Sequence, residues 1–186
     1  MPWRPAALFA FLMMLVGAPA HAQGTGMSRR FSVDLGLGSH AKDRGDVESM
    51  SVGFAVSRLV ALAATVERSH IPTRLRTYPG GYSATRNGTL TSISGEFRLT
   101  VPVGNRWTPY GVVGRGVGES MLNVNEYFPN PIRRTAGLVY AGGGVRYELG
   151  PRAAIFSDAK LILVIGREAD DVSARLPIRA GVSFRF

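Results

Sequence analysis

The sequence predicts an all-β protein: a closed antiparallel up-and-down transmembrane β-barrel of about eight strands, preceded by a cleaved signal peptide. Three observations predict this fold. The N-terminus has the pattern of an export signal, apolar residues recur at every second position through the rest of the chain, and the connections alternate between long and short. A chain of 186 residues has room for one such domain and a short leader.

The first 22 residues follow the order of a secretory signal peptide. Arg4 gives a positive start, an apolar run extends from Ala6 to Gly17, and Ala20-His21-Ala22 forms a small-x-small cleavage site. The run is shorter than the ~20 residues of a membrane-spanning helix, which argues against an uncleaved anchor as the alternative. We therefore expect export and cleavage after Ala22, which leaves residues 23–186 as one barrel domain.

The chain contains no cysteine. Small exported domains usually depend on disulfides when their core is thin. A barrel closed by hydrogen bonds in lipid is another source of stability, because every backbone polar group can find a partner in its wall. The formal net charge of +9 and the 45% of hydrophobic residues suit several classes of protein and decide little by themselves.

Apolar and polar residues alternate in about eight segments of roughly ten residues, the length that a tilted strand needs to cross a bilayer. In the C-terminal segment, every second residue from Leu176 to Phe186 is apolar, and the opposite parity carries Arg175, Arg179 and Arg185. One face of that strand is therefore apolar and the other charged. The remaining segments lie at 31–38, 50–57, 60–67, 92–101, 110–118, 139–149 and 155–165.

The glycine-rich segment 110–118 shows the weakest alternation of the eight. We expect Tyr110 and Val112 on its apolar, outward face and Arg115 on its polar face. Alternation alone does not separate a soluble barrel, which hides its apolar face, from a membrane barrel, which exposes it. A soluble exported ligand-binding barrel is therefore an alternative that would need the apolar faces to point inward.

The lengths of the connections favour the membrane barrel. Long polar connections are expected at Ser39–Val47, Ser69–Gly88, Glu119–Arg134 and Arg167–Ser173. Shorter turns are expected between them, around Ser57-Arg58, Gly104-Asn105-Arg106 and Gly150-Pro151-Arg152. Outer-membrane barrels with both chain ends in the periplasm have long external loops and short periplasmic turns. The order of long and short connections has the phase that this arrangement requires.

Aromatic residues gather where this arrangement puts the periplasmic rim. They are Phe31, Trp107, Tyr110, Tyr147, Phe184 and Phe186. Amphipathic rings prefer the membrane interface, and such rings form girdles around outer-membrane barrels. The clustering therefore indicates a lipid-facing wall.

The chain resembles the small outer-membrane barrels of the OmpA-like superfamily. The resemblance rests on the leader ending in Ala20-His21-Ala22, the segments Thr108–Gly118 and Ala141–Val145, and the terminal Val182–Phe186. It covers essentially the whole mature chain and implies an outer-membrane location. It also implies recognition of the terminal strand, with Phe184 and Phe186, by the barrel assembly machinery. Because the sequence stops at this strand, we expect no following peptidoglycan-binding domain.

Ionisable residues occupy the parity opposite the apolar faces, which points into the lumen. They are Asp34, Glu96, Arg98, Arg115, Arg146, Glu148, Asp158, Lys160, Arg179 and Arg185. The interior of an eight-stranded barrel is only wide enough to be filled by side chains. Unpaired buried ions cost several kcal/mol each, so we expect these groups to form an ion-pair network that plugs the lumen. A narrow ion or proton path is the functional alternative.

No catalytic, cofactor or metal site is predicted. Gly111, Gly114, Gly116 and Gly118 resemble a phosphate-binding loop only superficially, because no helical pattern follows them. Glycines in a tightly curved barrel wall explain the cluster better.

Two histidines of the mature chain, His40 and His70, fall at expected external strand ends without metal-ligand spacing. Nearby serines and acids (Ser39, Asp43, Glu67 and Ser69) make a lipid A-modifying hydrolase the enzymatic alternative, since lipid A deacylases are also small outer-membrane barrels. A catalytic triad needs its members within hydrogen-bond reach. The deacylase-type His-x-Ser-Asn stretch is missing, because His70 is followed by Ile71 and Pro72.

The expected external segments are basic. They contain Lys42, Arg44, Arg74, Arg76, Arg86, Arg133, Arg134 and Arg167. Arginine suits bidentate contacts to phosphate, so these residues are either lipopolysaccharide contacts or solvated loop charge; no motif that reads nucleic acid accompanies them. The sequence thus predicts a monomeric, non-enzymatic outer-membrane barrel that serves envelope integrity or surface and lipopolysaccharide contact.

Overall fold

The computed structural model describes residues 30–41, 45–77, 83–101, 103, 106–122, 132–165 and 174–186. They form strands β1 (Phe31–His40), β2 (Asp46–Ala55), β3 (Val60–Thr77), β4 (Ser83–Thr100), β5 (Trp107–Leu122), β6 (Ile132–Glu148), β7 (Ala153–Ile165), β8 (Ala174–Arg175) and β9 (Pro177–Arg185). These residues contain no helix long and apolar enough to cross a membrane. The leader expected at residues 1–22 lies outside the described residues.

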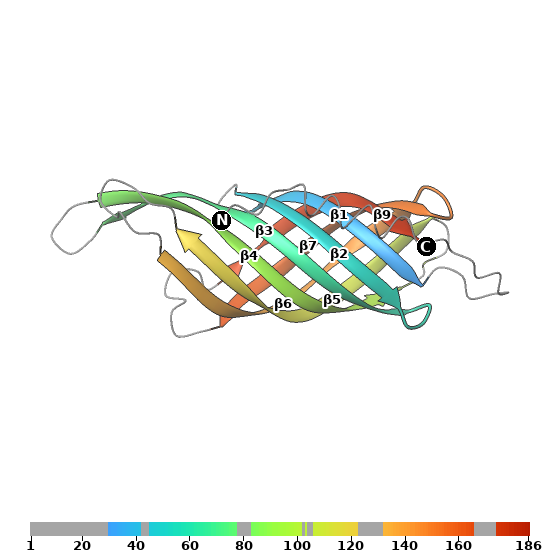
Figure 1. Cartoon of the computed structure of the whole chain (residues 1–186). Helices are drawn as coiled ribbons and strands as arrows, with labels where there is room; N and C mark the ends of the chain where they lie inside the picture. Colours follow the sequence, from blue (N-terminus) through green and yellow to red (C-terminus); the bar gives the residue numbers. More distant parts are fainter. Residues whose placement is uncertain are drawn as a thin grey trace.

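Each strand pairs antiparallel with its neighbours, and the sheet closes on itself (Figure 1). β1 to β7 follow one another in order, and β9 pairs with both β7 and β1. β8 and β9 are two parts of the last wall strand, since both pair with β7. Pro177, which has no N–H to donate, begins the second part. The described residues thus form an up-and-down barrel of eight wall strands, which confirms the predicted fold.

Side chains alternate between the outer surface and the lumen along the strands. On β7, Ile155, Leu161 and Leu163 are exposed, whereas Asp158 and Lys160 are buried. On β9, the same alternation exposes Ile178, Val182 and Phe184 and buries Arg179 and Ser183. A soluble barrel would show the reverse arrangement. The apolar exterior is that of a wall that faces lipid.

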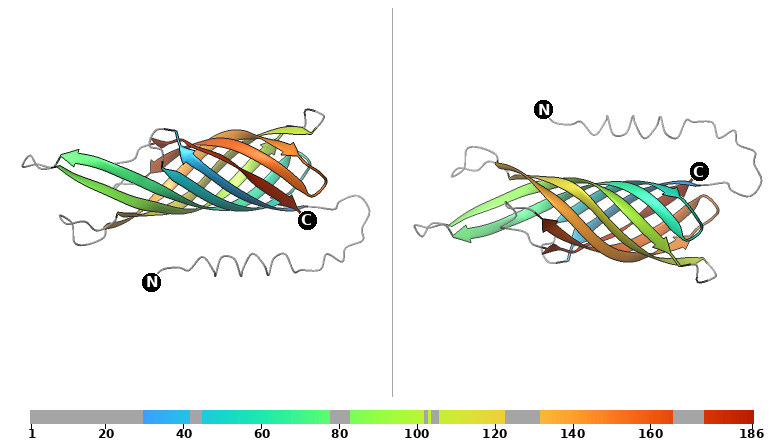
Figure 2. Two further views of the ribbon diagram at one scale, coloured as in Figure 1. Left: turned by 90° about the horizontal axis from the view of Figure 1, so that it is seen from above. Right: turned by 90° about the horizontal axis from the view of Figure 1, so that it is seen from below.

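The two ends of the barrel differ. β3 and β4 have 18 residues each, and their hairpin projects beyond the other strands at one end (Figures 1 and 2). The chain terminus lies at the other end, where the Phe186 N–H donates to the Phe31 carbonyl at 3.0 Å. Exposed aromatic residues gather at this second end: Trp107 packs on Tyr147 with ring centroids 4.7 Å apart.

The predicted external segment Ser69–Gly88 was wrong in its extent. β3 continues to Thr77 and β4 begins at Ser83, so most of this segment is a paired hairpin. Likewise, β6 begins at Ile132, inside the predicted connection Glu119–Arg134. The physical reason is that apolar alternation ends where lipid ends, whereas backbone pairing can continue into water.

The predicted faces of β5 were also wrong. Val112 and Tyr110 are buried in the lumen, and Arg115 is exposed on the outer surface between the exposed Val113 and Val117. The error has a physical origin, because glycines at both parities leave few side chains in this strand from which an apolar face can be recognised. Tyr110 therefore belongs to the interior and not to the aromatic girdle.

Candidate functional site

Among the residues that the structure describes, ten ionisable side chains form the salt bridges found inside the barrel. The acids are Asp34, Glu67, Glu96, Glu148 and Asp158, and the bases are Arg98, Arg146, Lys160, Arg179 and Arg185. We call this set the lumen network. Its five acids and five bases cancel, so the chain's formal net charge of +9 belongs entirely to residues outside it.

Arg179 is the centre of one half of the lumen network. Its Nε and Nη2 donate to the two carboxylate oxygens of Asp158 at 2.9 and 2.8 Å, and its Nη1 donates to Glu67 at 3.1 Å. Asp158 faces Arg179 across the β7–β9 ladder, whereas Glu67 comes from β3. Tyr110 adds a hydrogen bond to Asp158 at 3.1 Å. This arginine therefore ties three strands together through bidentate geometry, the strongest form of such contacts.

Glu96 and Arg98, both on β4, form the other half. Arg98 donates to Glu96 at 2.9 Å and also to Asp34 on β1, while Lys160 on β7 donates to Glu96. Asp34 accepts a further, longer contact of 3.5 Å from Arg146. These side chains reach each other from strands that are not neighbours in the wall. Their contacts therefore cross the interior of the barrel and do not simply follow neighbouring strands of the wall.

A separate pair lies at the end of the lumen near the C-terminus. Arg185 of β9 donates to Glu148 of β6 at 2.5 Å. Both side chains are more exposed than those of the central groups, as expected at a barrel mouth. The lumen network thus extends from this mouth into the middle of the barrel.

Glycines in the wall make room for the large interior side chains. Gly114 pairs with Tyr140 across the β5–β6 ladder, and a Cβ at Gly114 would lie 2.5 Å from the Tyr140 ring. The Tyr140 hydroxyl, placed there, donates to Ser94 at 2.9 Å, and the Lys160 Nζ lies 5.0 Å from the ring centroid. The glycine cluster of β5 therefore serves packing of the lumen, in agreement with the curved-wall explanation.

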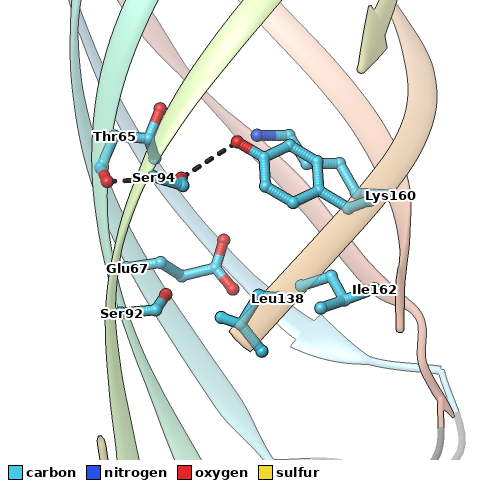
Figure 3. A pocket seen from close by; sticks show the side chains of 8 residues that line it. Thr65, Glu67, Ser92, Ser94, Leu138, Lys160 and Ile162 are labelled. Carbon is cyan, nitrogen blue, oxygen red and sulfur yellow. Dashed lines mark hydrogen bonds between the residues drawn. The ribbon is translucent and has the colours of Figure 1, made fainter. Parts of the chain in front are cut away.

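A small cavity lies beside the lumen network (Figure 3). Its lining consists of Thr65, Glu67, Ser92 and Ser94 from β3 and β4, and Leu138, Tyr140, Lys160 and Ile162 from β6 and β7. The first wall is polar, while most of the second belongs to an apolar cluster with Val112. Such a space, with hydroxyl and carboxylate groups on one side, suits ordered water.

Nine of the ten residues predicted for the lumen lie in the lumen network, and Arg115 does not. Sequence reasoning also missed Glu67 as a member. Its parity, shared with Ala63 and Thr65, was the signal that could have found it, since both of those residues are buried too. His40 and Arg175 are buried as well, on the inward parity of their strands.

Within the described residues, the proposed hydrolase groups are divided between the two faces of the wall: Ser39 is exposed, and His40 is buried on the inward face of β1. His70 is exposed on the outer surface, whereas Ser69 and Glu67 are buried on the inner face, and Glu67 is held by Arg179. Asp43 lies outside the described residues. In the described part of the chain, no group of three or more His, Cys, Asp or Glu side chains could hold a metal ion.

The predicted basic positions that the structure describes lie toward the projecting end. Arg133 is exposed, with its Nη1 3.7 Å from Glu119. Arg74, Arg76 and Arg86 belong to the outer parts of β3 and β4, where the register pairs position 74 with position 86, and Arg134 lies on β6. Lys42, Arg44 and Arg167 lie outside the described residues. Between Arg68 and Gly95 the sequence contains no acid.

No family model matches the chain, and no curated protein matches it in sequence. Solved structures do match. The N-terminal barrel of OprF from Pseudomonas aeruginosa aligns with a TM-score of 0.56 at 20% identity, over 84% of this chain and 96% of that one. A major outer-membrane protein from Thermus thermophilus aligns with a TM-score of 0.62 at 14% identity, over 86% of this chain and all of the other.

A third neighbour is Ail, the attachment invasion locus protein of Yersinia pestis, in a complex with the heparin analogue sucrose octasulfate. It aligns with a TM-score of 0.54 at 12% identity, over 86% of this chain and 100% of that one. This chain has the fold of the small outer-membrane barrels. The resemblance predicted from the sequence is confirmed for the fold, and the predicted outer-membrane location agrees with these neighbours.

Proposed function

We propose that this protein is a non-enzymatic integral outer-membrane barrel whose lumen is closed by ion pairs and whose basic outer segments contact lipopolysaccharide or another anionic surface. The single observation that carries the proposal is the distribution of charge. Within the lumen network the charges cancel, whereas the part of the β3–β4 hairpin between Arg68 and Gly95 has arginines and no acid. A leader at residues 1–22 and a role for Phe184 and Phe186 in membrane insertion are parts of the same proposal.

The crossing side chains support a closed lumen. Arg179 links β9 to β3, Arg98 links β4 to β1, and Lys160 links β7 to β4. An eight-stranded barrel has little interior space beyond its side chains. Three such links across a narrow interior support a lumen without a continuous column of water.

The outer hairpin supports a surface role. Arg74 and Arg86 occupy directly paired positions, and Arg76 follows at the same parity as Arg74. Like charges at paired positions destabilise a hairpin unless an anion compensates them. Phosphate groups of lipopolysaccharide are the nearest source of such anions, and Ail shows that a barrel of this fold can be crystallised with a polyanion.

Conductance across a planar bilayer tests the closed lumen. The refolded protein, checked by heat-modifiable gel migration, should give at most rare, small current steps. Replacing both Glu96 and Lys160 with alanine removes one crossing link and should raise the frequency of steps, whereas Arg133→Ala on the outer surface should not. Large, stable steps from the unchanged protein would favour the narrow ion-conducting barrel instead.

Incubation with lipopolysaccharide tests the outer role and the absence of catalysis together. The protein should retain lipopolysaccharide in a pull-down at low salt, and replacing Arg74, Arg76 and Arg86 with glutamine should weaken retention severalfold. Mass spectrometry should find every acyl chain intact. Loss of acyl chains that disappears with His70→Ala would instead establish the lipid A-modifying hydrolase.

A further inference from the structure

Arg115 is a charged residue on an apolar, lipid-facing part of the wall. Its cross-strand partners are Gly95 on β4 and Val139 on β6. Val113 and Val117 flank it at the same parity on β5, and both are more than half exposed. Among the described residues, no acid lies within salt-bridge distance of Arg115, in contrast to every base of the lumen network.

The position of Arg115 along β5 gives its depth in the membrane. Trp107, in the aromatic group near the chain terminus, lies eight residues before it on the same strand. Eight residues rise about 26 Å along a strand, which a tilt of roughly 40° reduces to about 20 Å of an apolar band about 25 Å tall. Arg115 therefore lies in the third of this band nearest the projecting end of the barrel.

A polar row lies just beyond this position. It is centred on Glu119, which lies four residues after Arg115 on β5 and pairs with Thr91 on β4 and Thr135 on β6. All three residues are exposed. This row marks the level at which the wall leaves the hydrocarbon. A long arginine stem can lie along apolar surface while the guanidinium reaches such an interface.

From this geometry we propose that Arg115 binds a phosphate group of a lipopolysaccharide molecule packed against β4, β5 and β6. Its stem would lie over Val117 and its guanidinium would point toward the polar row. A guanidinium makes bidentate contacts to phosphate. Glu119, the acid of the polar row, lies 3.7 Å from Arg133, and among the described residues no carboxylate lies within salt-bridge distance of Arg115. The site rests on the orientation in the proposed function, which puts the projecting end outside the cell and phosphorylated glycolipid in the adjoining leaflet.

The absence of a side chain at Gly95 leaves space beside Arg115 for a lipid headgroup. Gly95 is exposed, and a Cβ built on it would have no atom within 4 Å, so the wall is open beside the arginine. Arg68, exposed on β3, pairs with Thr91 from the other side of β4. It lies opposite Glu48 on β2, which makes it a weaker anion site than Arg115. The proposal therefore concerns Arg115 first.

The test is the urea midpoint of unfolding for the protein purified from its membrane and reconstituted into three kinds of vesicle. These contain phosphatidylcholine alone, phosphatidylcholine with lipopolysaccharide, or phosphatidylcholine with lipopolysaccharide stripped of its phosphates. Lipopolysaccharide should raise the midpoint of the unchanged protein, and removal of its phosphates should abolish most of that rise. Arg115→Leu should lose at least half of the rise, and Arg115→Lys should retain an intermediate part of it.

Two controls separate loss of a phosphate contact at Arg115 from a general change in stability or net charge. Leucine suits a lipid-facing wall, so Arg115→Leu should unfold in phosphatidylcholine alone at a urea concentration no lower than that of the unchanged protein. The matched control is Arg58→Leu, which removes an exposed arginine from the turn at the opposite end and should keep the full rise. An equal rise in the Arg115→Leu and unchanged proteins, or no rise in either, would overturn the proposal. Neither result would alter the conductance or hairpin measurements, which test the proposed function separately.

Discussion

Arg179 and Arg115 show how the same side chain is accommodated in two regions of this barrel. Arg179, in the lumen, has two carboxylates within 3.1 Å and is almost fully buried. Arg115, on the outer wall, is surrounded by Val113, Val117 and Val139. The first charge is compensated by the protein itself, and the second depends on what surrounds the protein.

This difference separates stability from interaction. The lumen network is neutral as a set, so its members need no outside partner. The excess of positive charge belongs to residues outside this network, and those that are exposed, such as Arg58 and Arg115, can meet lipid phosphates or water. We therefore expect changes in the lumen to affect folding in any membrane, and changes on the outside to depend on the lipid.

The largest effect should come from Arg179→Gln. This change leaves Asp158 and Glu67 buried without their cation, and removal of one partner of a buried pair costs about 3–5 kcal/mol. The free energy of unfolding in urea, measured in phosphatidylcholine vesicles, should fall by that amount. Arg58→Gln, in an exposed turn, should change it by less than about 0.5 kcal/mol. A loss below about 1 kcal/mol for Arg179→Gln would mean that the network contributes little to folding.

A smaller loss is expected from Val113→Arg on the outer wall. Val113 lies two residues nearer the middle of the membrane than Arg115 and is exposed to lipid. An arginine near the midplane of an outer-membrane barrel costs about 2–4 kcal/mol, and the cost falls toward the interface. Val113→Leu is the matched control and should be nearly neutral. If Val113→Arg were equally neutral in the same unfolding titration, the depth assigned to Arg115 would be wrong.

The sequence predicted the faces of a strand well only where apolar and polar residues were clearly separated between its two parities. In the segment from Arg175 to Phe186, which contains β9, six apolar residues alternate with a face that carries three arginines, and both faces were predicted correctly. In β5, glycines occupy both parities, and the assignment of Tyr110, Val112 and Arg115 was reversed. An alternating pattern predicts a strand. Its apolar face can be assigned only where one parity carries clearly apolar side chains and the other carries polar ones.

The sequence could identify the charged lumen positions but not their pairing. Parity puts Glu96 and Lys160 on inward faces, yet their contact joins β4 to β7 across the interior. Such a contact depends on the curvature and stagger of the closed wall, which no local pattern contains. The same limitation explains why the outer extent of β3 and β4 was missed, because strand pairing beyond the membrane leaves no hydrophobic signature.

The smallest effect should come from Arg133→Gln, which breaks an ion pair on the outside. Arg133 and Glu119 lie 3.7 Å apart, with side chains 66% and 52% exposed. Exposed pairs contribute about 0.2–1 kcal/mol, because water and salt screen them and two long side chains must be ordered. A double-mutant cycle with Glu119→Gln, measured by urea unfolding in phosphatidylcholine vesicles, should give a coupling energy in that range that shrinks between low and high salt. A coupling energy as large as that of a buried pair would show that lipid headgroups shield Arg133 and Glu119 from water. The water-exposed part of the outer surface would then begin farther toward the projecting end than this pair.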